Sequence, residues 1–209
     1  MKNKQIIVLG RGRSGTSIVA GLLDNLGVNM GLSRPAGINN PKGYFEDVEI
    51  SSLLDKYIDE EQMPVISDIN NDFEKEFKKL VKSKSEEVWG WKQPKTLYLL
   101  PIIIKHLENP YIIVCNREME AHIKSINSAF WGNRKSDEWC RRSIEHYQIE
   151  LKKFFEFNDC PRLNVHFEDF MDNNKSKKII KKICEFVGIE YNLNKVKDFI
   201  SPKQSKYTI

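Results

Sequence analysis

The stretch QIIVLGRGRSGTSIVAGLL (residues 5–23) constrains the fold of this chain more than any other part of its sequence. Residues 5–9 are an apolar run typical of a strand buried on both faces, and they lead into a loop with three glycines. Apolar residues then recur at helical spacing, at Ile18, Leu22, Leu23 and Leu26. Gly27 follows as a typical helix stop. A strand, a glycine-rich loop and a helix in this order predict an α/β fold.

Strands and helices alternate along the rest of the chain. Short apolar runs predict further strands at 88–91, 111–115 and 163–167. Helical patterns lie at about 46–60, 71–85, 96–108, 118–130, 137–158 and 175–188. We therefore predict a three-layer α/β/α sandwich with a central parallel sheet, of the P-loop nucleotide-binding type. The length of 209 residues favours a single domain over residues 1–209.

Composition narrows the class of ligand. The net charge of +4 is spread along the chain, which suits a small anionic ligand better than a nucleic acid. The four cysteines and four histidines show no metal-ligand spacing, so we predict no metal site. No apolar run approaches the roughly 20 residues that span a bilayer. We expect a cytoplasmic protein without stable membrane insertion and without a nucleic-acid partner.

The segment GRGRSGTS (residues 10–17) has the spacing of a phosphate-binding loop, with four residues between Gly10 and Gly15. Backbone N–H groups and the positive end of a helix dipole converge at such a junction, which favours an anion there. A nucleoside-triphosphate loop has lysine after the second glycine, but this chain has Thr16. Arg13 supplies a charge from inside the loop instead. An altered kinase-type loop and a plain strand-to-helix turn are the alternatives.

Arg-Ser-Gly-Thr-Ser (13–17) resembles the 5′-phosphosulfate loop of sulfotransferases that use 3′-phosphoadenosine 5′-phosphosulfate (PAPS). Other segments resemble bacterial members of this family and follow in the family's order. They are NPKGYFEDVEI (40–50), WKQPKTLYLLP (91–101), YIIVCNREMEAHIKS (111–125), LNVHFEDF (163–170) and FISPKQSKY (199–207). The resemblance thus spans nearly the whole chain, and its most specific parts are the first loop and the pair Arg117 and Ser125.

The resemblance implies roles for the first loop. Arg13 is implied beside the bridging and sulfuryl oxygens of PAPS, where a guanidinium can donate two parallel hydrogen bonds. The 5′-phosphate is implied to lie on the backbone and hydroxyl groups of Ser14, Gly15, Thr16 and Ser17. Arg11 matches no position to which the family gives a role.

The resemblance also implies sites for the rest of the donor. Arg117 follows the strand at 111–115, and Ser125 lies about two helical turns further on; together they are implied to bind the 3′-phosphate. Because ligands bind at the carboxyl ends of strands in such sheets, the position of Arg117 favours this role. Phe167 is implied against the adenine, although it is equally typical of a core residue. The donor product would be adenosine 3′,5′-bisphosphate.

The segment around Lys92 departs from the family pattern. Lys92 is implied to contact the transferring sulfuryl group. Gln93 stands where many bacterial relatives have aspartate, and Lys95 stands where they have arginine. Pro94 replaces the histidine that serves as the base in sulfotransferases of hormones and phenols. The general base must therefore come from elsewhere.

Carbohydrate sulfotransferases use a carboxylate just after the first helix, and this chain has Phe-Glu-Asp-Val-Glu at 45–49. The pattern of an acidic residue followed by an aliphatic one favours Asp47 as the base, with Glu46 next. These acids are equally typical of a helix N-terminus. The long segment 28–45 is expected to line the acceptor pocket.

The sequence thus predicts a PAPS-dependent sulfotransferase acting on a hydroxyl group of a carbohydrate or other small molecule. A small P-loop kinase that uses ATP and magnesium, and a nucleotide-binding module without catalysis, are the alternatives. The acceptor and the oligomeric state cannot be read from the sequence.

Overall fold

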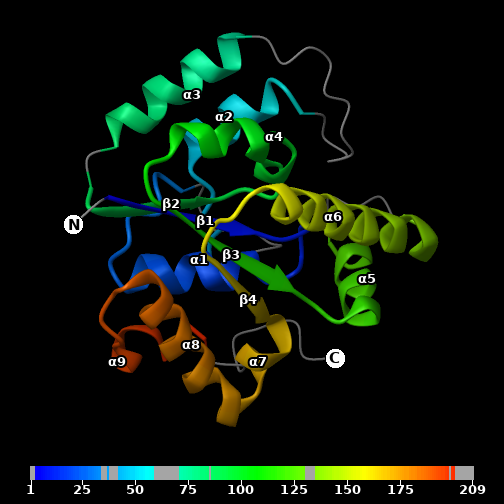
Figure 1. Cartoon of the computed structure of the whole chain (residues 1–209). Coiled ribbons are helices and arrows are strands. Elements are labelled where there is room, and N and C mark those ends of the chain that lie inside the picture. Colours follow the sequence, from blue (N-terminus) through cyan, green and yellow to red (C-terminus); the bar gives the residue numbers. More distant parts are fainter. Residues whose placement is uncertain are drawn as a thin grey trace.

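A parallel sheet forms the centre of the molecule (Figure 1). The computed structural model describes residues 3–33, 37, 42–58, 71–84, 86–129, 135–197 and 199–200. The four strands lie in the order β2-β1-β3-β4 and are β1 (Lys4–Leu9), β2 (Val88–Lys92), β3 (Pro110–Asn116) and β4 (Arg162–His166). Because each pair is parallel, the carboxyl ends of all four strands lie along one edge.

Alternate residues of β1 face opposite sides of the sheet. Ile6 and Val8 pack toward α1 (Thr16–Asn25) and α8 (Asn173–Val187). Ile7 and Leu9 pack into a second core that includes the aromatic pair Trp89 and Trp91 of β2. That second core is covered by α2 (Val48–Asp55), α3 (Asn71–Ser83), α4 (Thr96–Ile103) and α6 (Asp137–Phe157).

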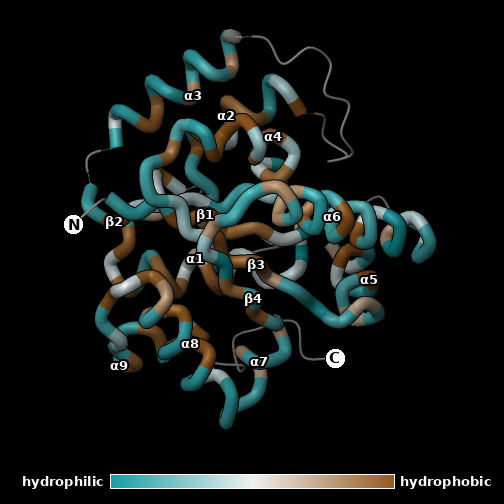
Figure 2. Tube along the Cα trace, viewed as in Figure 1, coloured by the Kyte–Doolittle hydropathy of each residue, from teal (hydrophilic) through white to brown (hydrophobic). Residues whose placement is uncertain are grey.

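The two helical layers confirm the predicted three-layer α/β/α sandwich. In Figure 1, α2, α3 and α4 lie on one side of the sheet, and α1, α8 and α9 (Leu193–Val196) lie on the other. Figure 2 shows apolar colour along the strands and polar colour along much of α3, as expected for strands buried on both faces under amphipathic helices. The strand at the β4 edge is the exception, since its residues alternate between buried and exposed.

Several element boundaries differ from the predicted ones for local reasons. The predicted helix at 46–60 begins only at Val48, because the Asp47 side chain caps it. The predicted helix at 96–108 is split into α4, which contains Pro101, and a 3-10 turn, η1 (Ile104–His106). Phe167 does not end the strand as predicted but opens a short helix, α7 (Phe167–Met171), whose first turn carries two acids.

The sequence predicted neither membrane insertion nor a metal site, and the structure bears on both in the part of the chain that it describes. Within it, no helix is both long and apolar enough to cross a membrane. In the same residues, no group of histidine, cysteine and carboxylate side chains is arranged to hold a metal ion.

Candidate functional site

The loop between β1 and α1, residues 10–15, is called the glycine loop below. Arg13 and Gly15 both adopt left-handed backbone conformations, with φ of 75° and 98°. Gly15 is the residue before α1, and a Cβ there would lie 2.9 Å from Cδ2 of Phe167. The loop therefore needs glycine at this position for both backbone and space.

The start of α1 is suited to an anion. The N–H groups of the first helical turn have no partner within the helix, and the helix dipole adds partial positive charge there. Ser14 is 1% exposed, and its Oγ has no hydrogen-bond partner among the described residues. A buried hydroxyl of this kind is costly unless a ligand or water pairs with it, so the site is built to hold a polar group.

Two side chains of helix α6 are hydrogen-bonded to the glycine loop. The Gly10 amide donates to Tyr147 Oη over 3.1 Å, and Tyr147 Oη in turn donates to the Pro94 carbonyl over 3.1 Å. Arg11 Nε donates to Ser143 Oγ over 2.7 Å, and burial lowers the pKa of this guanidinium. Arg11 therefore points toward α6 and joins the loop to it, a role that the sequence did not reveal.

Helix α5 (Met119–Asn127), which packs against α6, also contacts the loop. His122 Nε2 lies 2.9 Å from the Gly12 carbonyl oxygen. One turn further along the same helix, Ser125 Oγ accepts a hydrogen bond from Arg13 Nε over 3.3 Å. The α5 helix thus presents two polar side chains, three residues apart, to the loop.

Arg117 completes this side of the site at the end of β3. Its Nη1 donates to the Arg13 carbonyl over 3.2 Å, and its guanidinium carbon lies 4.0 Å from the centre of the Phe167 ring. Arg13, predicted beside the sulfuryl group, is therefore in contact with Arg117 and Ser125, the pair predicted for the 3′-phosphate. Phe167 packs between Gly15 and Arg117, and its predicted contact with adenine stays a prediction.

Lys92 and Glu46 form a close ion pair beside this cluster. Lys92 ends β2, is 3% exposed, and its Nζ lies 2.6 Å from Glu46 Oε1. The register pairs Lys92 with Val8, two residues before the glycine loop. The segment carrying Glu46 also touches α1, because Ser17 Oγ donates to the Tyr44 carbonyl over 3.4 Å. The two predicted catalytic residues are thus neighbours.

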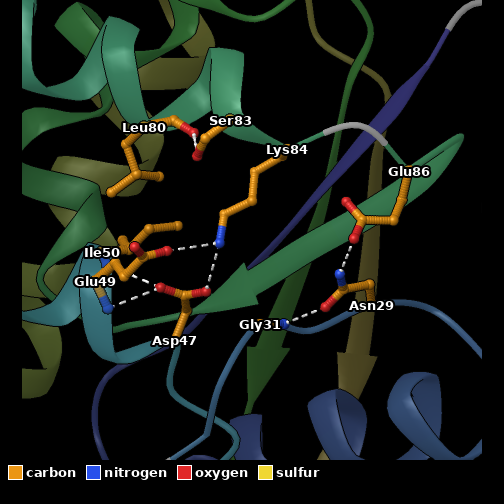
Figure 3. A network of polar contacts seen from close by, with 9 residues as sticks. All are labelled: Asn29, Gly31, Asp47, Glu49, Ile50, Leu80, Ser83, Lys84 and Glu86. Atoms are coloured by element: carbon orange, nitrogen blue, oxygen red, sulfur yellow. Dashed lines mark hydrogen bonds and ion pairs between the residues drawn. The ribbon is translucent and has the colours of Figure 1, made fainter.

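The neighbouring carboxylate, Asp47, is engaged elsewhere. Figure 3 shows its Oδ1 accepting from the amides of Glu49 and Ile50, each over 2.9 Å, and its Oδ2 accepting from Lys84 over 3.1 Å. Lys84 also bonds Glu49 over 3.0 Å. A Cβ at Gly31 would overlap Asp47 Oδ2, so the glycine makes room for this carboxylate. Asp47 serves as the cap of α2 and as the partner of Lys84, whereas Glu46 faces Lys92.

The other residues of the predicted lysine segment lie against α2. Lys95 Nζ lies 2.8 Å from Asp55 Oδ1 and donates to the Ile58 carbonyl over 3.3 Å. Gln93 Nε2 donates to Ser51 Oγ over 3.2 Å. These contacts hold α2 against the end of β2, and they direct Lys95 away from the Lys92 and Glu46 pair.

The sequence did not reveal the contacts that anchor the glycine loop. They join Gly10, Arg11 and Gly12 of the loop to Tyr147, Ser143 and His122. A signal was present in the case of α6, because Ser143 and Tyr147 are polar residues four positions apart on its buried face. The partner of such a pair is set by the tertiary structure. Parts of the predicted acceptor segment, 34–36 and 38–41, and residues 201–207 of the predicted carboxy-terminal loop lie outside the described residues.

The first residue of that carboxy-terminal loop, Phe199, packs against the segment that precedes Glu46. The ring of Phe199 contacts Phe45 edge to face, with the ring centres 5.6 Å apart. A Cβ at Gly21 of α1 would overlap both rings, so this glycine admits the aromatic pair. Phe45 directly precedes Glu46, so Phe199 packs beside the segment that carries the predicted base.

Comparisons with known proteins place this arrangement in context. The fold matches the sulfotransferase domain of the olefin synthase from Synechococcus PCC 7002, with a TM-score of 0.60, 16% identity, and coverage of 98% of this chain and 81% of that one. It also matches the sulfotransferase STF1 from Mycobacterium tuberculosis H37Rv, with a TM-score of 0.59, 14% identity, and coverage of 98% and 72%.

A third match is a sulfotransferase domain from the curacin biosynthetic pathway, with a TM-score of 0.60, 13% identity, and coverage of 94% of this chain and 78% of that one. No curated protein sequence matches the chain at a significant level. The model of the sulfotransferase family matches residues 5–192, which is most of the chain. The matched range contains the glycine loop, Lys92 and Arg117, and this chain is a member of the sulfotransferase family.

Proposed function

We propose that the chain transfers a sulfuryl group from PAPS to a hydroxyl group of a small molecule or carbohydrate, using residues 1–209 as a single domain. One observation carries the proposal. The glycine loop and the pair Arg117 and Ser125 are joined through Arg13, whose Nε bonds Ser125 and whose carbonyl bonds Arg117. Anions held by the loop and by this pair would be neighbours, which fits a nucleotide with phosphates on both its 5′ and 3′ positions.

The residues of the site fit such a donor. The amides at the start of α1 and the buried Ser14 hydroxyl offer hydrogen bonds to a 5′-phosphate. Arg117 donates to the Arg13 carbonyl and Arg13 Nε donates to Ser125, so two arginines are held at the loop, and each guanidinium can pair with an anion. When bound, PAPS supplies a sulfuryl group on a phosphate leaving group. The fixed donors of the loop then stabilise negative charge where it develops.

Glu46 is the proposed general base. Its carboxylate is ion-paired with Lys92, the last residue of β2, and it is proposed to take the proton of an acceptor hydroxyl. Lys92 orients that carboxylate and brings a positive charge to the side of the loop where the sulfuryl group is expected. Asp47 is less suited to this role, because both of its oxygens are already hydrogen-bonded.

A binding titration tests the donor assignment. The protein is titrated with adenosine 3′,5′-bisphosphate, with 5′-AMP, and with ADP and ATP in the presence of magnesium. We expect the bisphosphate to bind most tightly, and Arg117→Ala to remove most of its advantage over 5′-AMP. A charge-assisted hydrogen bond contributes about 1.5–3 kcal/mol, so the ratio is expected to fall roughly 10- to 150-fold. Tighter binding of ATP would reject the proposal.

Transfer itself is tested with labelled PAPS on a panel of glycans, lipids and small phenols. Labelled product on one acceptor class identifies the substrate. Bisphosphate binding without transfer to any member of a broad panel would favour a binding module instead.

A further inference from the structure

The carbonyl groups of the glycine loop need partners outside the anion site. A loop that directs its N–H groups at an anion must direct its carbonyl oxygens away from it, since the two groups carry opposite partial charges. Two consecutive carbonyls, those of Gly12 and Arg13, are bonded to side chains of the β3–α5 segment, His122 and Arg117. The left-handed conformation of Arg13 lies at this same point of the chain.

The contact of His122 defines its protonation at one atom. A carbonyl oxygen only accepts hydrogen bonds, so Nε2 of His122 must carry a proton and donate it to Gly12 over 2.9 Å. The side chain is 2% exposed, and this contact joins α5 to a loop 110 residues earlier in the chain.

The surroundings of His122 favour a neutral ring. Burial, against the opposing effect of the Gly12 bond and together with the positive charges of Arg117, Arg11 and Arg13, lowers the pKa of His122 to about 4. A neutral imidazole is suited to this position because it donates a hydrogen bond without adding a fourth cation to the three guanidinium groups. A lysine or an arginine in its place would add that charge.

We propose that His122 is a positioning residue that holds the Gly12 carbonyl away from the anion site, so that the glycine loop is already in its anion-binding form before a nucleotide arrives. His122 and Ser125 lie on the same face of α5, three residues apart. The helix that carries the proposed 3′-phosphate contact thereby also sets the shape of the 5′ loop. The inference rests on the proposed function only for the identity of the nucleotide.

Two substitutions separate the hydrogen bond from the packing of this side chain. His122→Gln keeps a neutral N–H donor of similar reach, and His122→Leu keeps much of the volume without a donor. The control is Ile126→Val on the same helix, where the buried side chain packs against Cys140 and Ile144 rather than against the loop. All three variants are compared with the wild type by thermal unfolding, so that a general loss of stability is recognised.

The first measurement is amide hydrogen exchange of residues 11–16 in the ligand-free protein, and the second is the Kd for adenosine 3′,5′-bisphosphate. In His122→Leu we expect the loop amides to exchange about tenfold faster and the Kd to rise about tenfold, the effect of about 1.4 kcal/mol. In His122→Gln and Ile126→Val, both quantities are expected to stay within about threefold of the wild type.

Unchanged exchange and unchanged Kd in His122→Leu would overturn the proposal, and so would equal losses in His122→Leu and His122→Gln. The exchange measurement needs no nucleotide. If the wild type fails to bind the bisphosphate, the proposed function fails, and the comparison of loop exchange still decides the role of His122.

Discussion

Replacing Glu46 and Asp47 one at a time tests how the structure divides two adjacent carboxylates between catalysis and folding. Glu46→Gln removes the proposed proton acceptor but keeps an amide oxygen that can accept from Lys92. Loss of a general base lowers kcat by about 10²- to 10⁴-fold. The melting temperature is expected to fall as well, because the buried Lys92 keeps a hydrogen bond but loses the negative charge of Glu46.

Asp47→Asn is expected to lower the stability of the fold and to leave kcat nearly unchanged. Asparagine is a good N-cap, so α2 keeps its first bonds. What is lost is the charged partner of Lys84, which still has Glu49 at 3.0 Å. Since a hydrogen bond between charged groups contributes about 1.5–3 kcal/mol, and since one partner remains, the loss of stability is expected at about 1–2 kcal/mol. For a chain of this size that corresponds to a fall of about 2–8 °C in Tm.

The assay measures kcat and KM with labelled PAPS on an acceptor that the wild type uses, and the melting temperature is taken from a thermal scan of each variant. The kcat of Asp47→Asn is expected within about threefold of the wild type, because the proton acceptor is untouched. If Asp47→Asn lost kcat as strongly as expected for Glu46→Gln while keeping its Tm, the two roles would have to be exchanged.

Three further predictions concern the glycine loop and its supports. Gly15→Ala is expected to lower the free energy of unfolding in urea by about 1–3 kcal/mol more than Gly27→Ala. Both glycines have φ near 98°, but only at Gly15 would the added Cβ meet a ring, that of Phe167, at 2.9 Å. Equal losses would contradict the steric argument. Tyr147→Phe leaves the Gly10 amide and the Pro94 carbonyl without their hydroxyl partner. We expect the free energy of unfolding to fall by about 2–4 kcal/mol, and no loss would show that the hydroxyl is unbonded. The pKa of His122 is lowered from 6.5 to about 4 in the folded chain. As the pH falls, the unfolded chain therefore takes up a proton on this residue before the folded chain does. The free energy of unfolding is expected to drop by about 3 kcal/mol between pH 6.5 and pH 4. His122→Gln is expected to show a shallower fall over that range in thermal scans, and an identical pH dependence would count against the lowered pKa.

The fold was predictable because its signals are local. The apolar run at 5–9, the glycines of the loop and the helical spacing after it each depend on neighbours within a few residues. The positions of Lys92 and Arg117 at the ends of two strands followed from the same runs, since parallel strands end at one edge. The helix start at Val48 was missed by two residues, although Asp47 is a typical N-cap residue.

The site was only partly predictable because its partners lie far apart in the sequence. The sequence favoured Asp47 over Glu46 as the base, whereas the different contacts of the two acids depend on Lys84 and Lys92, 37 and 46 residues away. Arg11 resembled a loop arginine without a role until its contact with Ser143, 132 residues away, was visible.

The sequence by itself determined that a buried strand enters an anion-binding loop without the nucleotide lysine, and that a parallel sheet collects the charged residues at one edge. These features follow from periodicity, turn chemistry and helix dipoles, which act over a few residues. Only the tertiary structure decided which carboxylate pairs with Lys92, that Arg117 bonds the Arg13 carbonyl, and that His122 and Tyr147 hydrogen-bond the glycine loop. Those outcomes depend on distances between helices and strands that pack together only in the folded chain.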